Sequence, residues 1–306
     1  MASPGTVTAR PPVAFLGLGA LGAPMAANLA GAGFPLTVHN RSPGPEAALV
    51  AAGAVAASSA PEAVAAAELI CLCLSDDAAV ETVLEGVAPH LPAGSLVVDF
   101  STIAPATSQA LAAELAGRRV AYLDAPVTGG TEGARAGSLS VLVGGAAADL
   151  ERARPVLEAV GGRITHLGPV GAGQQAKAVN QVLVAGSYAA VAEAMALGQR
   201  LGLPMDQVRQ ALAAGAAGSW ALEHRAGSML EGRFPLGFRL ALHRKDLAIA
   251  LETAAAAGVE LPVSRLVAAM EDALMAAGHG NDDVSALARW FSPDADARPS
   301  SGQPER

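Results

Sequence analysis

Short apolar runs alternate with alanine-rich amphipathic stretches through the first half of the chain, and this alternation restricts the fold more than any other feature of the sequence. The runs predicted to be strands are Val13–Leu16, Leu36–Val38, Leu69–Leu74, Leu96–Val98, Val120–Leu123, Leu139–Val143 and Ile164–His166. The helix-like stretches between them are Ala23–Ala30, Pro43–Ala52, Asp76–Glu85, Pro105–Ala116 and Ala147–Val160. Because strands alternating with helices build βαβ units, we expect an α/β domain with a doubly wound, mostly parallel sheet.

The pattern changes near Gly168, after which no strand signals remain. Gly173–Leu201 is predicted to form one uninterrupted helix, about 43 Å long at 1.5 Å per residue. The further predicted helices are Met205–Ala214, Ser219–Leu230, Phe238–Ala256, Pro262–Ala277 and Asp283–Trp290. We therefore expect a flexible N-terminal tail, an α/β domain, an all-helical domain and a flexible C-terminal tail, with the respective ranges 1–11, 12–170, 171–291 and 292–306.

A glycine-rich turn joins the first predicted strand to the first predicted helix. It has a G-x-G-x-x-G pattern and consists of Gly17, Leu18, Gly19, Ala20, Leu21 and Gly22. Gly17 permits the tight turn, Gly19 lets the backbone approach a pyrophosphate, and Gly22 lets helix and strand pack closely. The amides of the first helical turn then face an anion. In this strand–turn–helix context the pattern predicts a Rossmann-type dinucleotide-binding domain.

The end of the second predicted strand indicates which dinucleotide is preferred. NAD sites usually carry an acidic residue there, which binds the adenosine ribose hydroxyls. Here the strand ends in Asn40-Arg41-Ser42, without an acid. Arg41 can pair with a 2′-phosphate, to which Asn40 and Ser42 can donate hydrogen bonds. The sequence therefore predicts that NADP(H) is preferred and that NAD(H) is possible, unless Arg41 is an ordinary surface arginine.

Composition excludes several classes of protein. With 52% hydrophobic and 16% charged residues, the chain is not disordered over most of its length. A net charge of −8 without a basic cluster argues against nucleic acid or an anionic membrane as a partner. The polar start of the chain does not resemble a signal peptide, and polar residues interrupt the apolar run 176–197, so we expect no membrane span. Cys71 and Cys73 are interpreted as small buried hydrophobic residues, which fits a reducing cytoplasm, and the six scattered His predict no metal site.

Three polar residues share one face at the start of the long predicted helix. Lys177, Asn180 and Gln181 have i, i+3, i+4 spacing, and the rest of this face is apolar. A lysine on an apolar stripe near a domain junction favours a chemical role, because desolvation lowers the pKa of an ammonium group. A snorkelling lysine at a helix start is an equally good interpretation from spacing alone.

Two other segments carry suitable chemistry. Thr128, Gly129 and Gly130 follow a predicted strand, and they offer a hydroxyl and backbone amides suited to a carboxylate. The charged run 242–247 lies late in the helical half, and a solvated helix face explains it equally well.

Together these segments resemble the β-hydroxyacid dehydrogenase family, which includes 3-hydroxyisobutyrate dehydrogenases, tartronate semialdehyde reductases and, more distantly, 6-phosphogluconate dehydrogenases. Four motifs match in order, and the segment DFSTIAP, starting at Asp99, also matches. The four motifs are GLGALGAPMAANL, DAPVTGG, GAGQQAKAVNQ and RKDLAIAL. The resemblance covers residues 12–291.

The resemblance implies roles for residues in each motif. Lys177 corresponds to the family's catalytic acid/base, which protonates the carbonyl oxygen as hydride arrives at carbon. The residues implied to bind the substrate are Thr128, Gly129, Gly130, Asn180 and Gln181. Those implied to line the cofactor pocket beside the glycine-rich turn are Leu74, Ser75, Thr102 and Lys245, the last of which closes over the nicotinamide end.

The chain departs from the family pattern at two positions. Gln181 stands where many members have Asn, and Thr128 stands where most have Ser. Asn180-Gln181 resembles the tartronate semialdehyde reductase branch. We therefore expect an NADP(H)-preferring reductase of a short semialdehyde, most like 2-hydroxy-3-oxopropionate reductase, with 3-hydroxyisobutyrate dehydrogenase and glyoxylate or succinic semialdehyde reductase as alternatives.

Two other interpretations fit the sequence less well. Imine reductases resemble this fold but generally lack the lysine, so Lys177 argues against that activity. A silent cofactor-binding protein would not need an intact lysine and carboxylate segment. The resemblance further implies a small-molecule carboxylate substrate and a homodimer or homotetramer.

Overall fold

The computed structural model describes residues 10–291 and divides into two compact units at Lys177/Ala178. Most of the predicted N-terminal tail and all of the predicted C-terminal tail lie outside the described residues. The division falls within a helix, six residues into it. The domain limits 12–170 and 171–291 stay a prediction.

The first unit is built on one sheet, in the order β3-β2-β1-β4-β5-β6-β8-β7, with β9 paired to β8. Its strands are β1 (Val13–Leu16), β2 (Leu36–His39), β3 (Val55–Ala56), β4 (Leu69–Leu72), β5 (Leu96–Asp99), β6 (Ala121–Asp124), β7 (Val127–Thr128), β8 (Leu139–Gly144) and β9 (Gly161–Gly168). The pairs from β3 to β6 are parallel, whereas β8 runs antiparallel to β6 and β7. The predicted fold class, a doubly wound and mostly parallel sheet, is confirmed.

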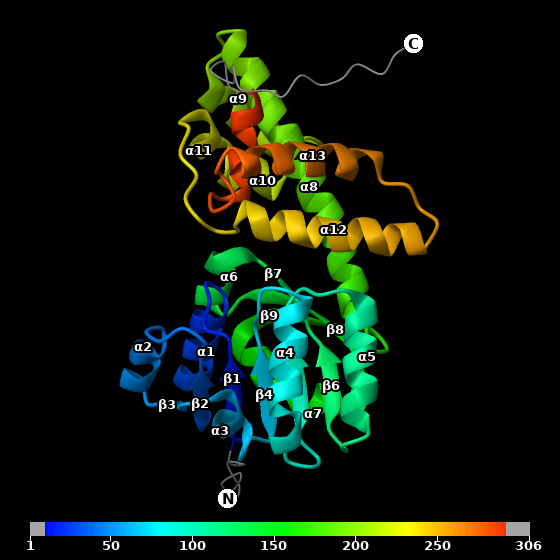
Figure 1. Cartoon of the computed structure of the whole chain (residues 1–306). Helices are drawn as coiled ribbons and strands as arrows, with labels where there is room; N and C mark the ends of the chain where they lie inside the picture. Colours follow the sequence, from blue (N-terminus) through cyan, green and yellow to red (C-terminus); the bar gives the residue numbers. More distant parts are fainter. Residues whose placement is uncertain (1–9, 292–306) are drawn as a thin grey trace, which may run out of the picture. The chain divides into compact units, whose positions relative to one another are not determined.

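Helices cover both faces of this sheet. They are α1 (Gly22–Gly31), α2 (Glu46–Ala51), α3 (Ala60–Val64), α4 (Asp77–Val87), the 3₁₀ turn η1 (Ala88–His90), α5 (Pro105–Ala116), α6 (Gly130–Ala136) and α7 (Ala147–Val160). Side chains of α1, α2, α6 and α7 share one apolar core with the sheet, and those of α3, α4 and α5 share another. Figure 1 shows α4 and α5 over one face of the sheet.

The central strands are apolar on both faces, because each face is covered. In β1, Val13 and Phe15 enter the core with α1 and α7, whereas Ala14 and Leu16 enter the core with α4 and α5. Burying a Val, Leu or Phe side chain stabilises the fold by about 1.5–3 kcal/mol. The continuous apolar runs of the sequence are therefore explained by burial on two sides.

The structure adds five short elements that the sequence did not predict. They are β3, α3, η1, β7 and α6. None is longer than seven residues, so none shows a hydrophobic period. Strand β4 ends at Leu72, two residues before the predicted end, and β9 begins three residues before its predicted start.

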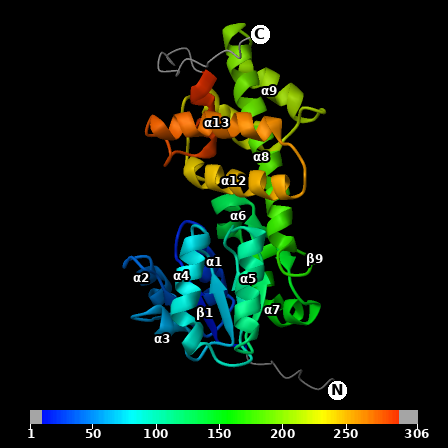
Figure 2. The ribbon, with the colours of Figure 1, turned by 45° about the vertical axis from the view of Figure 1, so that its right-hand side comes forward.

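The second unit, in its described residues, is helical. Its elements are α8 (Ala172–Arg200, from Ala178 onward), α9 (Met205–Ala213), α10 (Trp220–His224), α11 (Ala226–Leu230), α12 (Leu240–Ala256), α13 (Pro262–Ala276) and the 3₁₀ helix η2 (Val284–Phe291). Tyr188 and Met195 of α8 share a core with Leu247 of α12 and Val267 of α13. Figure 2 shows α12 and α13 side by side across α8.

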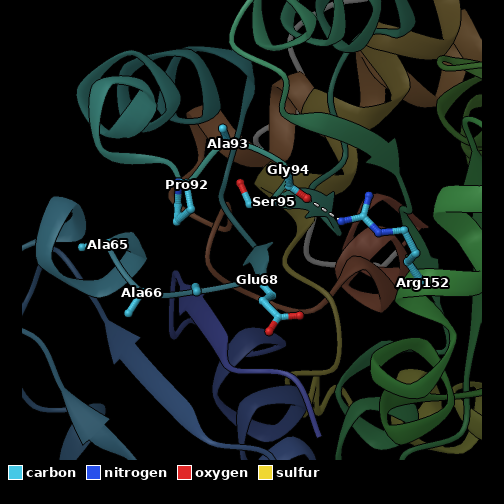
Figure 3. Close-up of a pocket in the computed structure, with 9 residues that line it drawn as sticks. Ala65, Ala66, Glu68, Pro92, Ala93, Gly94, Ser95 and Arg152 are labelled. Carbon is cyan, nitrogen blue, oxygen red and sulfur yellow. Dashed lines mark hydrogen bonds between the residues drawn. The ribbon is translucent and has the colours of Figure 1, made fainter.

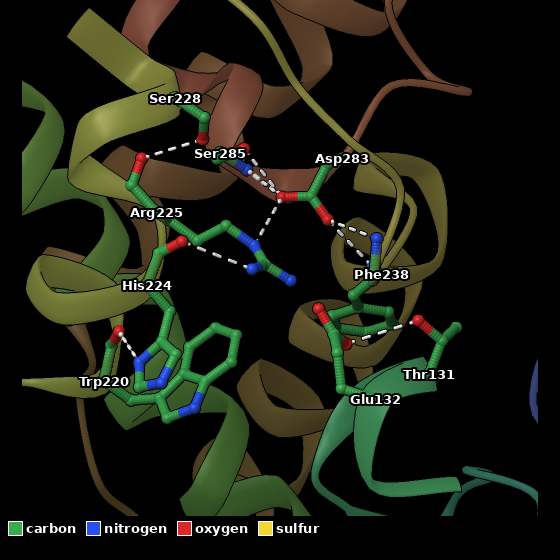
Figure 4. Close-up of polar contacts among 10 residues, drawn as sticks. Thr131, Glu132, Trp220, His224, Arg225, Ser228, Phe238, Asp283 and Ser285 are labelled. Carbon is green, nitrogen blue, oxygen red and sulfur yellow. Dashed lines mark hydrogen bonds and ion pairs between the residues drawn. The ribbon is translucent and has the colours of Figure 1, made fainter. Parts of the chain in front are cut away.

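One predicted helix of this unit, Ser219–Leu230, is wrong: the structure breaks it into α10 and α11 at Arg225. The guanidinium of Arg225 lies over the Trp220 ring and 3.6 Å from the Asp283 carboxylate. Asp283 is buried and accepts hydrogen bonds from the Gly237 and Phe238 amides (Figure 4). The contacts with Trp220 and Asp283 thus hold the Arg225 side chain at the residue where the two helices meet. The segment after Asp283 is a 3₁₀ helix instead of the predicted α-helix.

Helix α8 is long and apolar enough to cross a membrane by length and composition, with a mean hydropathy of 1.3 over 18 residues. In the described structure, 39% of that window is buried inside the protein. A core helix of a soluble protein meets the same criteria, so this property is weak evidence for a membrane span.

Candidate active site

The glycine-rich turn has the geometry that its pattern predicts. Gly17 has φ 95°, and a Cβ there would lie 2.4 Å from the Cys73 carbonyl oxygen. A Cβ on Gly22 would lie 1.9 Å from the Gly17 carbonyl oxygen. Nothing lies within 4 Å of a Cβ built on Gly19. The backbone at Gly19 is therefore open to a ligand, while the other two glycines are needed for packing.

The start of α1 is free to bind an anion. Among the described residues, the amides of Gly19, Ala20 and Leu21 donate to no backbone oxygen or side chain. The first turn of α1 holds no acidic residue and no side-chain cap. Unpaired amides and the helix dipole favour a phosphate at this position. The residues present therefore fit the pyrophosphate of a dinucleotide.

The Asn40-Arg41-Ser42 segment follows β2 beside this turn. Asn40 accepts a hydrogen bond from the Leu18 amide at 2.9 Å and donates one to the Ser42 carbonyl at 2.8 Å. Its amide therefore ties the segment to the glycine-rich turn. Arg41 and Ser42 are exposed, and no hydrogen bond or ion pair with another described residue holds the Arg41 guanidinium.

A hydrogen-bond relay orders the loop after β4. The Leu74 amide donates to Ser101 Oγ at 2.9 Å, and the Ser101 amide donates to the Asp99 carboxylate at 2.9 Å. Ser75 is exposed next to Leu74, and Thr102 follows Ser101. The structure therefore brings the loops that carry Leu74, Ser75 and Thr102 together at the carboxyl ends of β4 and β5. Their cofactor contacts stay a prediction.

Asp99 is buried beside a second carboxylate, because Asp99 of β5 and Asp124 of β6 are partners in the sheet register. Burial raises the pKa of Asp99 to about 6, although hydrogen bonds from Ser101 and Tyr122 lower it, and the Asp124 charge adds to the rise. Burial also raises the pKa of Asp124.

We expect Asp99→Asn to stabilise the protein near neutral pH and to lose this advantage in acid. The pKa of Asp99 is about 6 in the folded chain, against an ordinary value of 3.8. Between these values the folded state binds the proton more tightly than the unfolded state, so this group raises stability as the pH falls from 6 towards 4. Ionised Asp99 therefore destabilises the fold by roughly 3 kcal/mol at neutral pH, for two pKa units. Urea unfolding of wild type and Asp99→Asn at neutral pH and near pH 4 measures the difference in their free energies of unfolding. A difference that does not change with pH contradicts this prediction.

Asp124 holds the start of α8. Its carboxylate accepts from the Gly171 amide at 2.7 Å and the Gln174 amide at 2.9 Å. A negative charge at this position caps the helix and interacts favourably with the helix dipole. A Cβ on Gly173 would lie 2.3 Å from the Leu142 carbonyl oxygen and 2.8 Å from the Asp124 carboxylate. This end of α8 therefore packs directly on the sheet.

Gln174 is a positioning residue that the sequence analysis did not single out. Its side-chain oxygen accepts from the Ile103 amide at 3.3 Å, and its nitrogen donates to the Ser101 carbonyl at 2.8 Å. It therefore ties α8 to the loop after β5. Sequence spacing gives no signal for this role, because the partners lie more than seventy residues earlier in the chain.

Lys177 is buried, with 7% of its surface exposed, one turn into α8. Its ammonium donates to the Val127 carbonyl at 2.9 Å, which places it beside the segment Thr128, Gly129 and Gly130. The two glycines have φ of 132° and 63°, which only glycine adopts readily, and α6 begins there. The first unit therefore brings the predicted acid/base and the predicted carboxylate segment together.

Further along α8, the second unit holds a buried polar cluster. The Gln181 amide donates to an Asp246 carboxylate oxygen at 2.6 Å, and the Lys245 ammonium lies 2.8 Å from the other oxygen. Asn180 is half-buried next to Gln181. The sequence analysis did not single out Asp246, although it lies within the fourth motif.

An open hollow of about 420 Å³ lies elsewhere in the first unit, and Glu68, Ser95 and Arg152 are among its lining residues (Figure 3). Glu68 and Ser95 precede β4 and β5, so the hollow is at the opposite edge of the sheet from the glycine-rich turn. Within residues 10–291 no three His, Cys, Asp or Glu side chains are grouped to hold a metal ion.

This fold and this turn define the class of dinucleotide-binding proteins. Residues 12–168 match the family described as the NAD binding domain of 6-phosphogluconate dehydrogenase. Residues 171–291 match the family described as NAD-binding of NADP-dependent 3-hydroxyisobutyrate dehydrogenase.

Individual relatives match over almost their whole length. The chain is 40% identical over 291 residues to the NAD-dependent L-serine dehydrogenase of Pseudomonas aeruginosa, covering 92% of this chain and 98% of the relative. It is 39% identical over 276 residues to the 2-hydroxy-3-oxopropionate reductase of Escherichia coli, covering 89% and 94%. A solved structure of the Mycobacterium tuberculosis 3-hydroxyisobutyrate dehydrogenase with L-serine matches with a TM-score of 0.84 and 35% identity, covering 92% and 99%.

The chain belongs to the β-hydroxyacid dehydrogenase family, as its motifs predicted. It is an NAD(P)-dependent hydroxyacid dehydrogenase.

Proposed function

We propose that the protein is an NADP(H)-preferring oxidoreductase that transfers hydride between nicotinamide and a short 3-hydroxy acid or its semialdehyde. Its best candidate substrate is 2-hydroxy-3-oxopropionate. The observation that carries this proposal is the buried ammonium of Lys177, anchored on Val127 beside Thr128, Gly129 and Gly130. An acid/base next to a carboxylate-binding segment is what reduction of a semialdehyde acid requires.

In this proposal the cofactor transfers the hydride, and residues of the chain transfer the proton and hold the substrate. The nicotinamide cofactor supplies hydride to the aldehyde carbon in reduction and accepts it in oxidation. Lys177 donates its proton to the aldehyde oxygen as the C–H bond forms, so that the carbonyl becomes a primary alcohol, and it recovers a proton from water. Thr128, Gly129 and Gly130 hold the substrate carboxylate through the hydroxyl and backbone amides. Asn180 and Gln181 contact the rest of the substrate.

The cofactor preference rests on the segment after β2. Arg41 is exposed and carries no ion pair with another described residue, and no acidic residue stands at this strand end. A guanidinium there binds a 2′-phosphate, which a carboxylate would repel. The relative from P. aeruginosa is named NAD-dependent, so the cofactor has to be measured in this chain.

Several related substrates are alternatives. The relatives named for L-serine, 2-hydroxy-3-oxopropionate and 3-hydroxyisobutyrate match at similar identity. Glyoxylate and succinic semialdehyde fit the same chemistry, because each joins a carbonyl to a carboxylate. Sequence identity at this level supports the class of reaction more strongly than it supports any one substrate.

An apolar stripe supports a homodimer or homotetramer. Val179, Leu183 and Leu197 recur on one face of α8, Leu201 follows directly after its end, and all four are more than 60% exposed. Such a stripe favours burial against a second copy of the chain. We further propose a cytoplasmic location, which the free thiols of Cys71 and Cys73 fit.

We expect the wild-type enzyme to reduce 2-hydroxy-3-oxopropionate with kcat/KM about tenfold or more higher for NADPH than for NADH. Arg41→Ala should lower kcat/KM with NADPH by roughly 10- to 100-fold, because charge-assisted hydrogen bonds contribute about 1.5–3 kcal/mol. The value with NADH should stay unchanged. Steady-state kinetics with both cofactors measures these effects.

The same assay tests the substrate class when methylmalonate semialdehyde, succinic semialdehyde and glyoxylate are included. Similar kcat/KM for both cofactors in wild type contradicts the NADP(H) preference alone. Faster turnover of cyclic imines than of any semialdehyde, or cofactor binding without turnover, overturns the proposed function.

A further inference from the structure

Two buried carboxylates lie side by side at the carboxyl ends of β5 and β6. Asp99 and Asp124 are partners in the sheet register, and neither has any exposed surface. Asp124 holds the start of α8 through backbone amides. Asp99 instead accepts from the Ser101 amide and the Tyr122 hydroxyl, each at 2.9 Å. Within residues 10–291 no basic side chain forms an ion pair with Asp99, so its charge is not neutralised locally.

The charge of Asp99 is not needed for its hydrogen bonds. An Asn of the same shape would accept from the Ser101 amide with its oxygen and donate to the Tyr122 hydroxyl with its nitrogen. The Tyr122 hydrogen could then turn to Ser108, a neighbour of that hydroxyl. A buried charge without a cation also destabilises the fold. The ionised carboxylate therefore has no structural role that a neutral amide could not fill.

A chain of contacts within the first unit connects Asp99 to the glycine-rich turn. The Ser101 amide donates to Asp99, and the Leu74 amide donates to Ser101 Oγ. A Cβ on Gly17 would lie 2.7 Å from Leu74 Cδ2. A single layer of loop residues therefore separates the buried charge from the turn that fits a pyrophosphate.

The strand order indicates which half of a dinucleotide this charge faces. A dinucleotide binds across the point where the strand order reverses, which here is β1, paired with β2 on one side and β4 on the other. The adenosine half belongs to the β2 side, where Arg41 follows the strand. We therefore expect the nicotinamide half on the side of β4 and β5, whose carboxyl ends lead to Leu74 and Asp99.

Hydride transfer changes the charge of the nicotinamide ring. The oxidised ring carries one positive charge, which disappears when the ring accepts a hydride. A fixed negative charge nearby therefore stabilises the oxidised cofactor more than the reduced one. Solvent screens this interaction weakly, because no part of Asp99 is exposed.

We propose that ionised Asp99 strengthens the binding of NADP⁺ relative to NADPH. This inference rests on the proposed function, in which Arg41 binds the adenosine end of the cofactor. Asp99 touches neither substrate nor cofactor in this arrangement, and it acts through its charge. In the complex with substrate, the same charge favours hydride transfer from NADPH to the aldehyde, which is the direction of reduction.

The effect of Asp99 should weaken in acid, because protonation removes its charge. The pKa of Asp99 is about 6, as burial raises it, and NADP⁺ should lower it by favouring the ionised form. Two other groups that face Asp99 stay neutral, since burial raises the pKa of Cys73 to about 12 and that of Tyr122 above its ordinary value. Asp124, the remaining carboxylate, is retained when Asp99 alone is replaced. The cofactor's 2′-phosphate titrates in the same range, but it is common to NADP⁺ and NADPH and cancels in their ratio.

The test measures the Kd of NADPH by its fluorescence and the Kd of NADP⁺ by competition, for wild type and Asp99→Asn at pH 8 and pH 5. The ratio of the NADPH Kd to the NADP⁺ Kd reports the preference for the oxidised form. At pH 8 Asp99→Asn should lower this ratio by roughly 5- to 30-fold, the effect of two unit charges about 10 Å apart at an effective dielectric constant of about 20. At pH 5 the two proteins should differ less.

Two variants separate the charge from other effects. Glu68→Gln removes the same charge from an exposed residue at the opposite edge of the sheet and should keep the ratio within about twofold of wild type. Ser101→Ala removes the hydroxyl that holds the Leu74 amide but retains the charge, so it should weaken both cofactors equally. Urea unfolding at pH 8 should show Asp99→Asn to be at least as stable as wild type, so weaker NADP⁺ binding would not come from lost folding.

The outcomes separate the inference from the proposed function. If Asp99→Asn keeps the wild-type ratio or weakens both cofactors equally, or if Glu68→Gln shifts the ratio as far, the inference is overturned and the dehydrogenase assignment stands. If wild type binds NAD⁺ and NADH as tightly as NADP⁺ and NADPH, the NADP(H) preference alone fails, and the ratio for NAD⁺ and NADH tests Asp99 in the same way. If wild type binds no nicotinamide cofactor, the proposed function fails and takes the inference with it.

Discussion

Lys177→Ala should lower kcat/KM by about 10²- to 10⁴-fold, the usual contribution of a general acid/base. The ammonium sits at 2.9 Å from the Val127 carbonyl, buried beside the carboxylate segment. Without it, no group of this helix turn supplies a proton to the aldehyde oxygen. Steady-state reduction of 2-hydroxy-3-oxopropionate with NADPH measures the loss.

The variant should still bind the dinucleotide. Lys177 donates to Val127, whereas the free amides that fit a pyrophosphate belong to Gly19, Ala20 and Leu21. Titration of NADPH fluorescence should therefore give a dissociation constant within about threefold of wild type. Lys177→Met, which retains the apolar stem, controls for lost packing and should be equally inactive. Turnover at the wild-type rate in either variant would falsify the proposed role of the lysine.

The sequence predicted the sheet well because its apolar runs coincide with the strands that are buried in the structure. Strand β1 was placed to the residue, since Val13–Leu16 is apolar throughout and ends at the glycine-rich turn. Helices α5 and α7 were also placed to the residue, because each is bounded by turn residues. The two-residue strands β3 and β7 carry no period of their own and form only because a neighbouring strand offers hydrogen bonds.

The residues of the candidate site were less predictable when their role depends on tertiary partners. Lys177 was found from helix spacing and family resemblance. Asp124 and Gln174, which hold the start of α8, bond to partners that are tens of residues away. The orientation of Gln181 depends on Asp246, 65 residues later. No local pattern announces such contacts, because they arise only when the elements pack.

The packing at the start of α8 leads to a second large effect. We expect Gly173→Ala to destabilise the protein by about 1–3 kcal/mol, the usual range for overpacking a buried position. Its Cβ would lie 2.3 Å from the Leu142 carbonyl oxygen and 2.8 Å from Asp124, and neither group is a flexible chain end. The helix must therefore move away from β8 and carry Lys177 with it. A displacement of about 1 Å lowers turnover by roughly 10²-fold when groups must be aligned.

The matched control is Gly86→Ala in α4, where the glycine is exposed and nothing lies within 4 Å of the added Cβ. Alanine favours helix over glycine by up to about 1 kcal/mol, so this variant should be slightly more stable and fully active. Urea unfolding and kcat/KM are measured for both variants. If Gly173→Ala were as stable and as active as Gly86→Ala, the close contact of Gly173 with Leu142 and Asp124 would not determine where Lys177 lies. A loss of activity in Gly173→Ala with folding retained would instead show that contact with Leu142 and Asp124 sets the position of the acid/base.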